Sequence, residues 1–273
     1  MKLPNDPKLP FFTYGIFKPG QLCFSRIQAF VRKKEKVSIG GHLRERDGIP
    51  LLILGENALN IIGYLLDFDS GNEVKAYSRI IGIEPNKVYQ WHETIVGSRN
   101  VNILIGRREL RGSSDLEYIV EWDGSNDPYF KQGIEEVENI LHENQKFDID
   151  FRSLFRLQMA YSLLWSSIER YTGLKYHLGK DIVEKVSQLA KEVYFSSALK
   201  NVVSERREVF STTDLKKYTL DPDNPQKSLK YYYQVRSNSI HRGKAVVHDF
   251  NTIRSSLIEL LAIFKIVLNK SFK

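Results

Sequence analysis

Residues 11–21 read FFTYGIFKPGQ, an aromatic-rich run that ends in Gly, Pro and Gly. Phe, Tyr, Thr and Ile favour an extended strand, and the Gly and Pro positions favour a tight turn directly after it. Outward from this stretch, similar short runs recur up to Trp122, separated by Gly, Asn, Asp and Pro. This pattern predicts one short helix at 73–81 and strands at FFTYGIF (11–17), VSIGGHL (37–43), LLIL (51–54), NIIGYLLDF (60–68), YQWHETIV (89–96), VNILIG (101–106) and LEYIVEW (116–122).

The second half of the chain changes to a helical period. We expect a bridging helix at 133–144 and further helices at 181–199, 228–240 and 249–268. The longest apolar face follows Asp150, which we interpret as an N-cap; its members are Phe151, Leu154, Phe155, Leu157, Ala160, Tyr161, Leu164, Trp165 and Ile168. The chain is therefore predicted to be α+β, with a β-rich domain at 1–125, a linker or bridging helix at 126–147 and an all-α bundle at 148–273.

The net charge of +7 is unevenly distributed. Residues 1–146 carry 19 Lys and Arg against 20 Asp and Glu, whereas residues 147–273 carry 21 against 13. A basic second half is typical of a surface that binds a polyanion such as RNA. Equally, solvated lysines serve to keep a helical bundle soluble.

Cysteine and hydropathy patterns exclude several protein classes. The single cysteine, Cys23, rules out an intramolecular disulfide, and no Cys/His cluster has zinc-ligand spacing, so we expect neither a metal nor a cofactor. The first twenty residues lack the apolar run of a signal peptide. The most apolar stretch, 257–268, is interrupted by Glu259 and Lys265. We therefore predict a cytoplasmic protein without a membrane partner.

The turn at 14–20 resembles the YGxLxPG signature that opens the gamma-glutamylcyclotransferase-like fold, a small mixed β-barrel, with Phe17 in the place of Leu. The segments 48–50, 60–68 and 81–89 follow in the family's order, so the resemblance covers roughly residues 9–110. It implies a carboxylate-binding turn at Tyr14, Gly15, Ile16 and Phe17. It also implies that Glu84 is the general acid and base that releases 5-oxoproline from a gamma-glutamyl compound.

The residues around Glu84 suit that role in part. A carboxyl group enclosed by Ile81, Ile83 and Pro85 has a raised pKa, as acid–base catalysis near neutral pH requires. Three positions depart from the family: Pro85 follows the Glu, Trp91 stands where Arg is usual, and Ile81 with the following Gly replaces Leu-Asp. An ordinary surface carboxylate, a plain strand-end turn and a non-catalytic binding domain therefore stay open as alternatives.

Residues 229–246, LKYYYQVRSNSIHRGKAV, contain an R-x4-H motif formed by Arg236 and His241. The motif stands before the last predicted helix and resembles the active motif of HEPN domains, in the form found in the Apea-like subgroup. The resemblance covers roughly residues 148–270. It implies RNA cleavage without a metal, which leaves 2′,3′-cyclic phosphate ends. It further implies that His241 transfers a proton near neutral pH and that Arg236 binds the scissile phosphate.

Five residues of regular helix set the two side chains about 140° apart. One helix therefore presents them poorly to one phosphate, and the family's solution implies a two-fold homodimer. We expect additional RNA contacts from Ser237, Asn238, Arg242 and Lys244, and either base stacking or core packing by the tyrosines at 231–233. The structural alternative is a cation pair at a helix end.

The leading prediction is an endoribonuclease of toxin or antiviral-defence type. Its N-terminal domain then senses a gamma-glutamyl-like ligand, and an antitoxin or regulatory partner controls it. The alternative is a cyclotransferase that uses Glu84, with the helical domain serving dimerisation or nucleotide binding. A third interpretation is a binding module without activity at either site.

Overall fold

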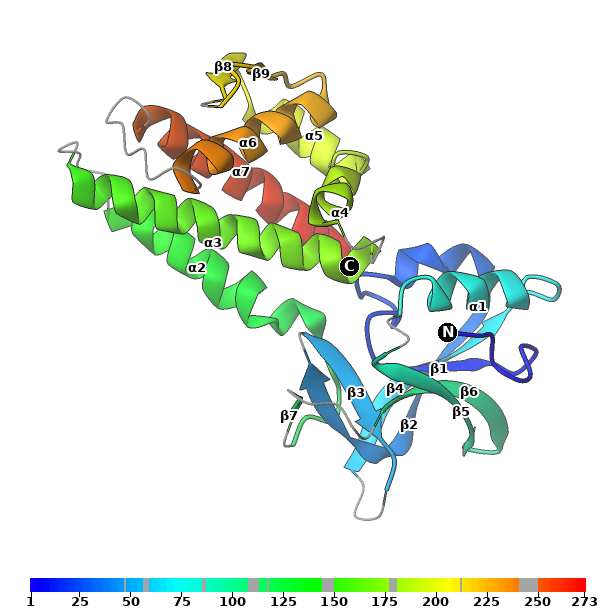
Figure 1. Ribbon diagram of the computed structural model, residues 1–273. Helices are drawn as coiled ribbons and strands as arrows, with labels where there is room; N and C mark the ends of the chain where they lie inside the picture. The colour runs from blue at the N-terminus through cyan, green and yellow to red at the C-terminus, as the bar shows by residue number, and fades with distance from the viewer. Residues whose placement is uncertain are drawn as a thin grey trace. The chain divides into compact units, whose positions relative to one another are not determined.

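The computed structural model describes residues 1–46, 48–55, 59–84, 87–107, 113–116, 118–143, 150–176, 181–211, 213–240 and 250–273 (Figure 1). It confirms that the chain is α+β. The residues form two compact units. The N-terminal unit comprises Met1–Asp127 with Ser271–Lys273, and the helical unit comprises Pro128–Lys270.

The N-terminal unit is built on a mixed sheet in the order β3-β2-β4-β1-β6-β5, with β7 paired to β2. Its strands are β1 (Phe11–Thr13), β2 (Val31–Arg46), β3 (Ile49–Ile53), β4 (Leu59–Phe68), β5 (Tyr89–Val96), β6 (Arg99–Gly106) and β7 (Ser114–Asp115). The short central strand β1 runs antiparallel to β4 and parallel to β6. The long strand β2 pairs first with β4 and then, near its end, with β3.

The small mixed β-barrel that the sequence predicts is present as a mixed sheet that does not close, because it stays open along one seam. The sheet curls until Leu51 of β3 lies against Gly106 of β6, where an added Cβ would be 2.9 Å from the Leu51 Cβ. No backbone ladder joins β3 to β6 among the described residues. Instead, the Tyr14 hydroxyl accepts from the Leu52 amide at 3.0 Å and donates to the Leu104 carbonyl at 2.8 Å. A side chain therefore takes the place of a ladder at this seam.

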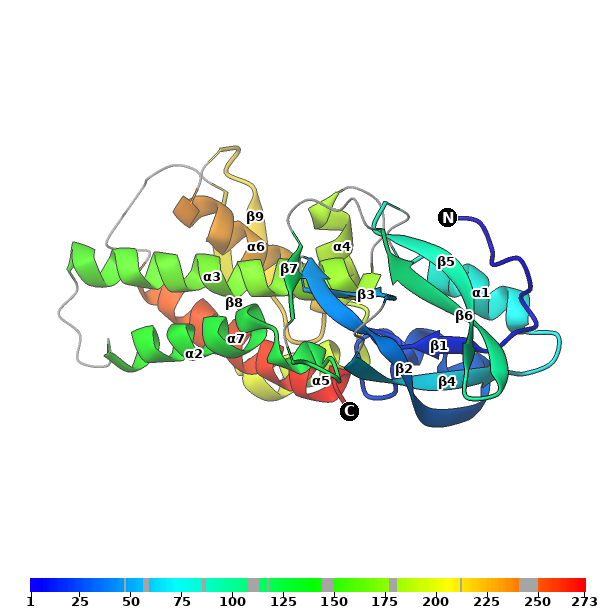
Figure 2. The same cartoon turned by 90° about the horizontal axis from the view of Figure 1, so that it is seen from below.

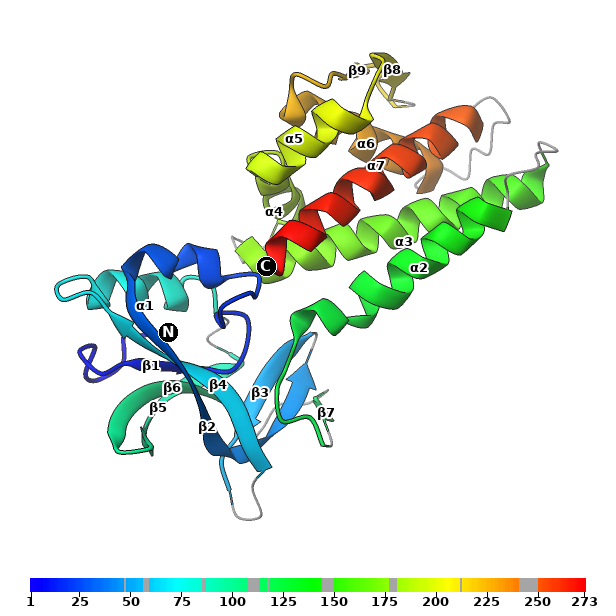
Figure 3. The ribbon, with the colours of Figure 1, turned by 180° about the vertical axis from the view of Figure 1, so that it is seen from behind.

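Helix α1 (Glu73–Ile81) has the bounds that the sequence predicts. It buries Ala76, Tyr77 and Ile80, one face of the helix, while Glu73 lies in the first turn, where a negative charge complements the helix dipole. The Tyr77 ring makes edge-on contacts with Phe68 of β4 and with Trp91 of β5. Helix α1 is thereby held against the sheet, as Figure 3 shows.

The strand predictions succeed where a partner strand is present. Strand β5 matches the prediction at 89–96, and Gly97, at φ 62°, provides the left-handed turn into β6. The predicted strand at 11–17 ends at Thr13, where the turn begins. The predicted strand at 116–122 is wrong for its described residues: Tyr118 has φ 66° and is exposed. This segment makes only single bonds to the sheet, such as that from the Ile62 amide to the Val120 carbonyl.

The helical unit contains six helices among its described residues. They are α2 (Pro128–Glu143), α3 (Phe151–Tyr176), α4 (Ile182–Leu189), α5 (Val193–Val202), α6 (Pro225–Ile240) and α7 (Phe250–Ser271). Helices α2 and α3 lie side by side (Figure 2). The acidic helix α2 therefore belongs to this unit and buries Phe130, Ile134, Val137 and Ile140 within it.

Two details of the helical prediction are wrong. Phe151 and Phe155 of the expected apolar face are exposed, although the other seven members are buried. The single helix expected at 181–199 is two helices, α4 and α5. The break lies at Glu192, whose carboxylate accepts hydrogen bonds from Tyr171 and Tyr176 of α3.

A hairpin of β8 (Arg207–Phe210) and β9 (Lys217–Leu220) precedes α6 and was not predicted. The Arg207 guanidinium forms an ion pair with Glu259 of α7, and the Tyr232 hydroxyl donates to the same carboxylate at 3.1 Å. None of the helices in the described part of the chain combines the length and apolar character that spanning a bilayer requires.

Candidate functional site

Glu84 lies in the turn that ends α1. The amides of Ile83 and Glu84 both donate to the Ile80 carbonyl, so the chain makes one further tight turn after the helix. That turn directs the Glu84 side chain inward, where only 7% of the residue is exposed. Residues 85 and 86 lie outside the described residues, so the predicted enclosure by Pro85 has no structural counterpart here.

The structure brings Glu84 together with two other predicted site residues. Tyr14 and Gly15 line the same cavity as Glu84, and the remaining walls come from Phe11, Phe12, Thr13, Tyr89 and Leu104. The cavity has a volume of about 10 Å³. That is room for about one water molecule, so a larger ligand enters only if a wall moves.

Burial raises the pKa of Glu84 to about 8. The cause is desolvation, since the cavity wall is aromatic and aliphatic and the Oε2 atom has no hydrogen-bond partner among the described residues. Burial likewise raises the pKa values of Tyr14 and Tyr89, and the nearby carboxylate of Glu84 adds to both shifts. At neutral pH Glu84 is a protonated acid in an apolar wall, suited to give and retake a proton.

The tyrosine hydroxyls beside Glu84 are engaged elsewhere. The Tyr14 hydroxyl bridges β3 and β6, and the Tyr89 hydroxyl donates to the carbonyl of Pro50. Both hydroxyls hold the curled sheet together. A ligand in this cavity therefore meets Glu84 as its only ionisable group with a free hydrogen-bonding atom.

The predicted carboxylate-binding turn follows Tyr14. The Lys18 amide donates to the Gly15 carbonyl at 3.0 Å, and the Cys23 amide donates to the Ile16 carbonyl at 2.9 Å. The amides of Gly15, Ile16 and Phe17 have no acceptor among the described residues. Adjacent free amides are the usual binding site for a carboxylate or phosphate.

Gly15 is required for the close approach of this turn to β3. A Cβ at this position would lie 2.9 Å from Cγ of Pro50. Pro50 also accepts the Tyr89 hydroxyl bond, so the turn, β3 and β5 meet at one point beside Glu84. A larger residue at position 15 would push the turn away from this point.

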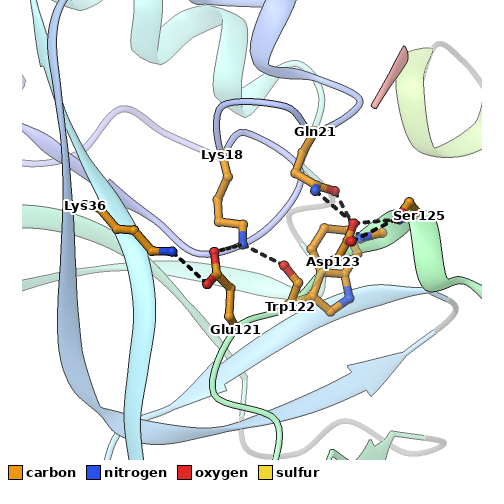
Figure 4. Close-up of polar contacts among 8 residues, drawn as sticks. Lys18, Gln21, Lys36, Glu121, Trp122, Asp123 and Ser125 are labelled. Carbon is orange, nitrogen blue, oxygen red and sulfur yellow. Dashed lines mark hydrogen bonds and ion pairs between the residues drawn. The ribbon is translucent and has the colours of Figure 1, made fainter. Parts of the chain in front are cut away.

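The sequence analysis did not predict a set of polar contacts that join the turn to residues 121–124 (Figure 4). The Lys18 ammonium donates to the Trp122 carbonyl at 2.6 Å and pairs with Glu121 at 3.3 Å. The Gln21 side chain accepts from the Gly124 amide at 3.0 Å and donates to Asp123 at 3.1 Å. The only signal in the sequence is the pair of polar residues inside an apolar turn, and their partners lie a hundred residues away.

Trp91, which stands where the gamma-glutamylcyclotransferase-like sequence pattern has Arg, does not line the Glu84 cavity. Its ring contacts Phe11 and Tyr77, and its indole N–H donates to the Lys2 carbonyl at 2.9 Å. This departure from the family pattern therefore leaves the cavity without an arginine from β5.

A second, open cavity of about 400 Å³ lies in the N-terminal unit and includes none of the predicted site residues. Its lining comes from the end of β3, the outer face of the β5–β6 hairpin and the residue after β6: Leu52, Ile53, Leu54, Gln90, His92, Ile105, Gly106 and Arg107. Among the described residues that line it, none carries a carboxylate such as that of Glu84.

The helical unit places the first half of the R-x4-H motif on α6. The Arg236 guanidinium pairs with Glu169 of α3 at 3.1 Å and lies 5.9 Å from the ring of Trp165 and 5.7 Å from that of Tyr233. Arg170, the next residue after Glu169, lies over the ring of Tyr129. Arg236 is thus held at the surface by one carboxylate and two aromatic rings.

The remaining residues of this motif divide into two groups. Asn238 accepts from Gln234 and donates to the Phe210 carbonyl at 2.8 Å, and Ser237 is half-buried. Tyr231 and Tyr232 are fully buried, so core packing is confirmed for both and base stacking is wrong for them. His241, Arg242 and Lys244 lie outside the described residues, so the geometry of the complete motif is not assigned.

No cluster of three or more His, Cys, Asp or Glu side chains suited to a metal ion occurs in the described part of the chain. The comparisons with known proteins found no match, neither to a family model nor to a curated protein nor to a solved structure. The functional assignment therefore depends on the geometry of the two sites.

Proposed function

We propose that the N-terminal unit is a cyclotransferase-type site for a gamma-glutamyl compound, with Glu84 as general acid and base. One observation carries the proposal: the buried carboxyl group of Glu84 shares a cavity with Tyr14 and Gly15 of the turn. Among the described residues, its Oε2 atom has no hydrogen-bond partner, and the amides of Gly15, Ile16 and Phe17 have no acceptor. The turn offers donors for the α-carboxylate of the ligand. Glu84 then stands near the amine and the side-chain carbonyl.

The reaction balances with Glu84 as its proton carrier. The amine nitrogen of the gamma-glutamyl group attacks its own side-chain carbonyl carbon, and the Glu84 carboxylate takes a proton from that nitrogen. When the original amide bond breaks, Glu84 returns the proton to the leaving amine. The products are 5-oxoproline and a free amine. A carboxyl pKa of about 8 suits both proton transfers, since neither form is strongly disfavoured near neutral pH.

The test is release of 5-oxoproline from gamma-glutamyl dipeptides by the full chain. We expect Glu84→Gln to lower the rate by a factor of about 100 or more, because general acid–base catalysis contributes that much. Glu93→Gln, on an exposed position of β5, is the matched control and keeps the wild-type rate. Equal rates in wild type and Glu84→Gln contradict the proposal.

The R-x4-H motif supports a second candidate function, an endoribonuclease of the helical unit acting as a homodimer. Its support is the placement of Arg236: a half-buried guanidinium held by Glu169, Trp165 and Tyr233, whose Nε has no hydrogen-bond partner among the described residues. An arginine fixed in this way suits a phosphate better than a mobile one. The excess of basic residues in this half of the chain supports the same function.

Incubation of total RNA with wild type and His241→Ala, in the presence of a chelator, tests this candidate. Cleavage by the wild type alone, with 2′,3′-cyclic phosphate ends, supports it. Absence of cleavage by a dimeric wild-type protein contradicts it, and the oligomeric state is measured by light scattering.

A further inference from the structure

The turn at 14–21 is tied to the segment 121–126, which we call the strap. Two residues of the turn, Lys18 and Gln21, make all four polar contacts given above with Glu121, Trp122, Asp123 and Gly124 of the strap (Figure 4). One residue, Asp127, separates the strap from α2, which begins at Pro128.

The contact through Lys18 is polar and buried. Lys18 is only 3% exposed, and burial lowers the pKa of its ammonium group. An apolar side chain packs into such a position without this desolvation cost. Lys36 also pairs with Glu121, at 2.9 Å, so the Glu121 carboxylate stands between two ammonium groups.

The strap is shaped to receive Gln21. Asp123 accepts from the Ser125 amide and so caps the short 3-10 helix η3 (Gly124–Asn126). A Cβ on Gly124 would lie 2.5 Å from the Trp122 ring and 3.1 Å from the Gln21 Oε1 atom. The Gln21 amide therefore fits a position that only glycine leaves open.

The same turn carries the free amides at 15–17 and one wall of the Glu84 cavity. Lys18 and Gln21 therefore tie the strap to the part of the chain that a carboxylate ligand on these amides would contact. We propose that the strap sets the position of this turn, so that a carboxylate ligand on the free amides and the order of residues 121–126 are coupled.

The identity of the ligand rests on the proposed function, whereas the mechanical coupling does not. By linkage, a ligand that binds better when the strap is docked must also hold the strap in place. The order of the strap, which leads into α2, therefore responds to the ligand.

Cys23 gives a direct probe of the turn. It is the only cysteine of the chain, it is 0% exposed, and its amide donates to the Ile16 carbonyl within the turn. A thiol reagent such as 5,5′-dithiobis(2-nitrobenzoate) reaches it only when the turn opens. The labelling rate under native conditions therefore measures opening of the turn in the full chain.

The first experiment compares wild type with Gln21→Ala, which loses both Gln21 contacts at a partly exposed position. We expect Cys23 to label about tenfold faster or more, as the loss of two hydrogen bonds implies. Lys18→Met, which keeps the aliphatic bulk, gives the same direction. Lys33→Ala, which breaks an exposed pair with Glu35, is the control and labels at the wild-type rate.

Unchanged labelling in Gln21→Ala overturns the proposal. Urea unfolding of each variant separates opening of the turn from global loss of structure. If Cys23 is labelled through global unfolding, the urea midpoint falls in proportion to the gain in labelling rate, whereas opening of the turn alone does not produce this match. If Lys18→Met does not fold, Gln21→Ala alone decides.

The second experiment uses 5-oxoproline and gamma-glutamyl-alanine as probes. In wild type we expect either probe to slow Cys23 labelling and to lower amide hydrogen exchange in residues 121–126. Gln21→Ala should bind the same probe more weakly only in proportion to the fraction of molecules whose turn is open. Labelling that the bound probe does not slow, or protection that stops at residue 21, overturns the coupling.

The two proposals fail separately. If no probe binds and no 5-oxoproline is released, the proposed function fails, while faster labelling in Gln21→Ala still supports the strap. If the probes bind and react but residues 121–126 do not respond, the function stands and the strap is refuted.

Discussion

Glu84→Gln tests the central electrostatic feature of the N-terminal unit without any assumption about substrate. The carboxyl pKa is about 8 in the folded chain and 4.5 when solvated. The folded state therefore holds the proton more tightly than the unfolded state. The contribution of Glu84 to stability is complete below pH 4.5, declines as the pH rises, and is lost once the pH passes through 8.

The size of the effect follows from this difference in pKa. One pKa unit corresponds to about 1.4 kcal/mol, so wild type loses about 3–4 kcal/mol of unfolding free energy between pH 5 and pH 8 because of Glu84. Gln keeps the shape and cannot ionise, so this loss disappears in the variant. Glu84→Gln should thus be more stable than wild type at pH 8 by about that amount, relative to pH 5.

The assay is urea unfolding followed by tryptophan fluorescence at several pH values. A Trp165→Phe background removes the buried indole of the helical unit, so that the signal comes from Trp91 and Trp122 of the N-terminal unit. Glu93→Gln in the same background is the control, because its side chain is exposed. A stability difference between wild type and Glu84→Gln that stays constant from pH 5 to pH 8 refutes the raised pKa.

Three further predictions concern single side chains. Tyr14→Phe leaves two buried backbone groups at the seam without their partner, and should lower the unfolding free energy by about 2–4 kcal/mol; a change below 1 kcal/mol in urea unfolding contradicts the bridging role. Gly15→Ala places a Cβ against Pro50 and should cost about 1–3 kcal/mol, whereas Gly55→Ala, with open space around it, should cost little; equal effects contradict the close approach. Arg236→Met should reduce the slope of log affinity for single-stranded RNA against log salt by about 0.7; an unchanged slope excludes Arg236 from phosphate binding.

The sequence predicts the elements whose periodicity agrees with their surroundings. Residues 73–81 and 89–96 have a clear pattern and a sheet to pack on, and both were predicted with the observed bounds. Residues 116–122 have an equally good strand pattern, but the neighbouring edges of β2 and β4 are already used by other strands. Phe151 and Phe155 follow the helical period of α3 yet are exposed. Periodicity identifies an apolar face and not what covers it.

The candidate site could be predicted as far as motifs reach. The order of short motifs was enough to place Glu84 and Gly15 in one site, and the structure brings both into one cavity. Lys18 and Gln21 were missed because their partners at 121–124 are joined to them only by the fold. For Tyr14 the motif predicts a ligand-binding residue, but its hydroxyl bridges β3 and β6 at the seam. No local sequence pattern encodes that bridge.

The seam between β3 and β6 has a mechanical consequence. Strands β2 and β4 are joined by a continuous ladder from Lys33 to Gly41, which shares a load over many bonds. Across the seam, the described contacts between strand and strand pass through single tyrosine hydroxyls, which are loaded one after another. Under a force applied across the sheet, as in unfolding by a processive protease, we expect the N-terminal unit to tear first along this line, with β3 and the end of β2 peeling away while the ladder still holds.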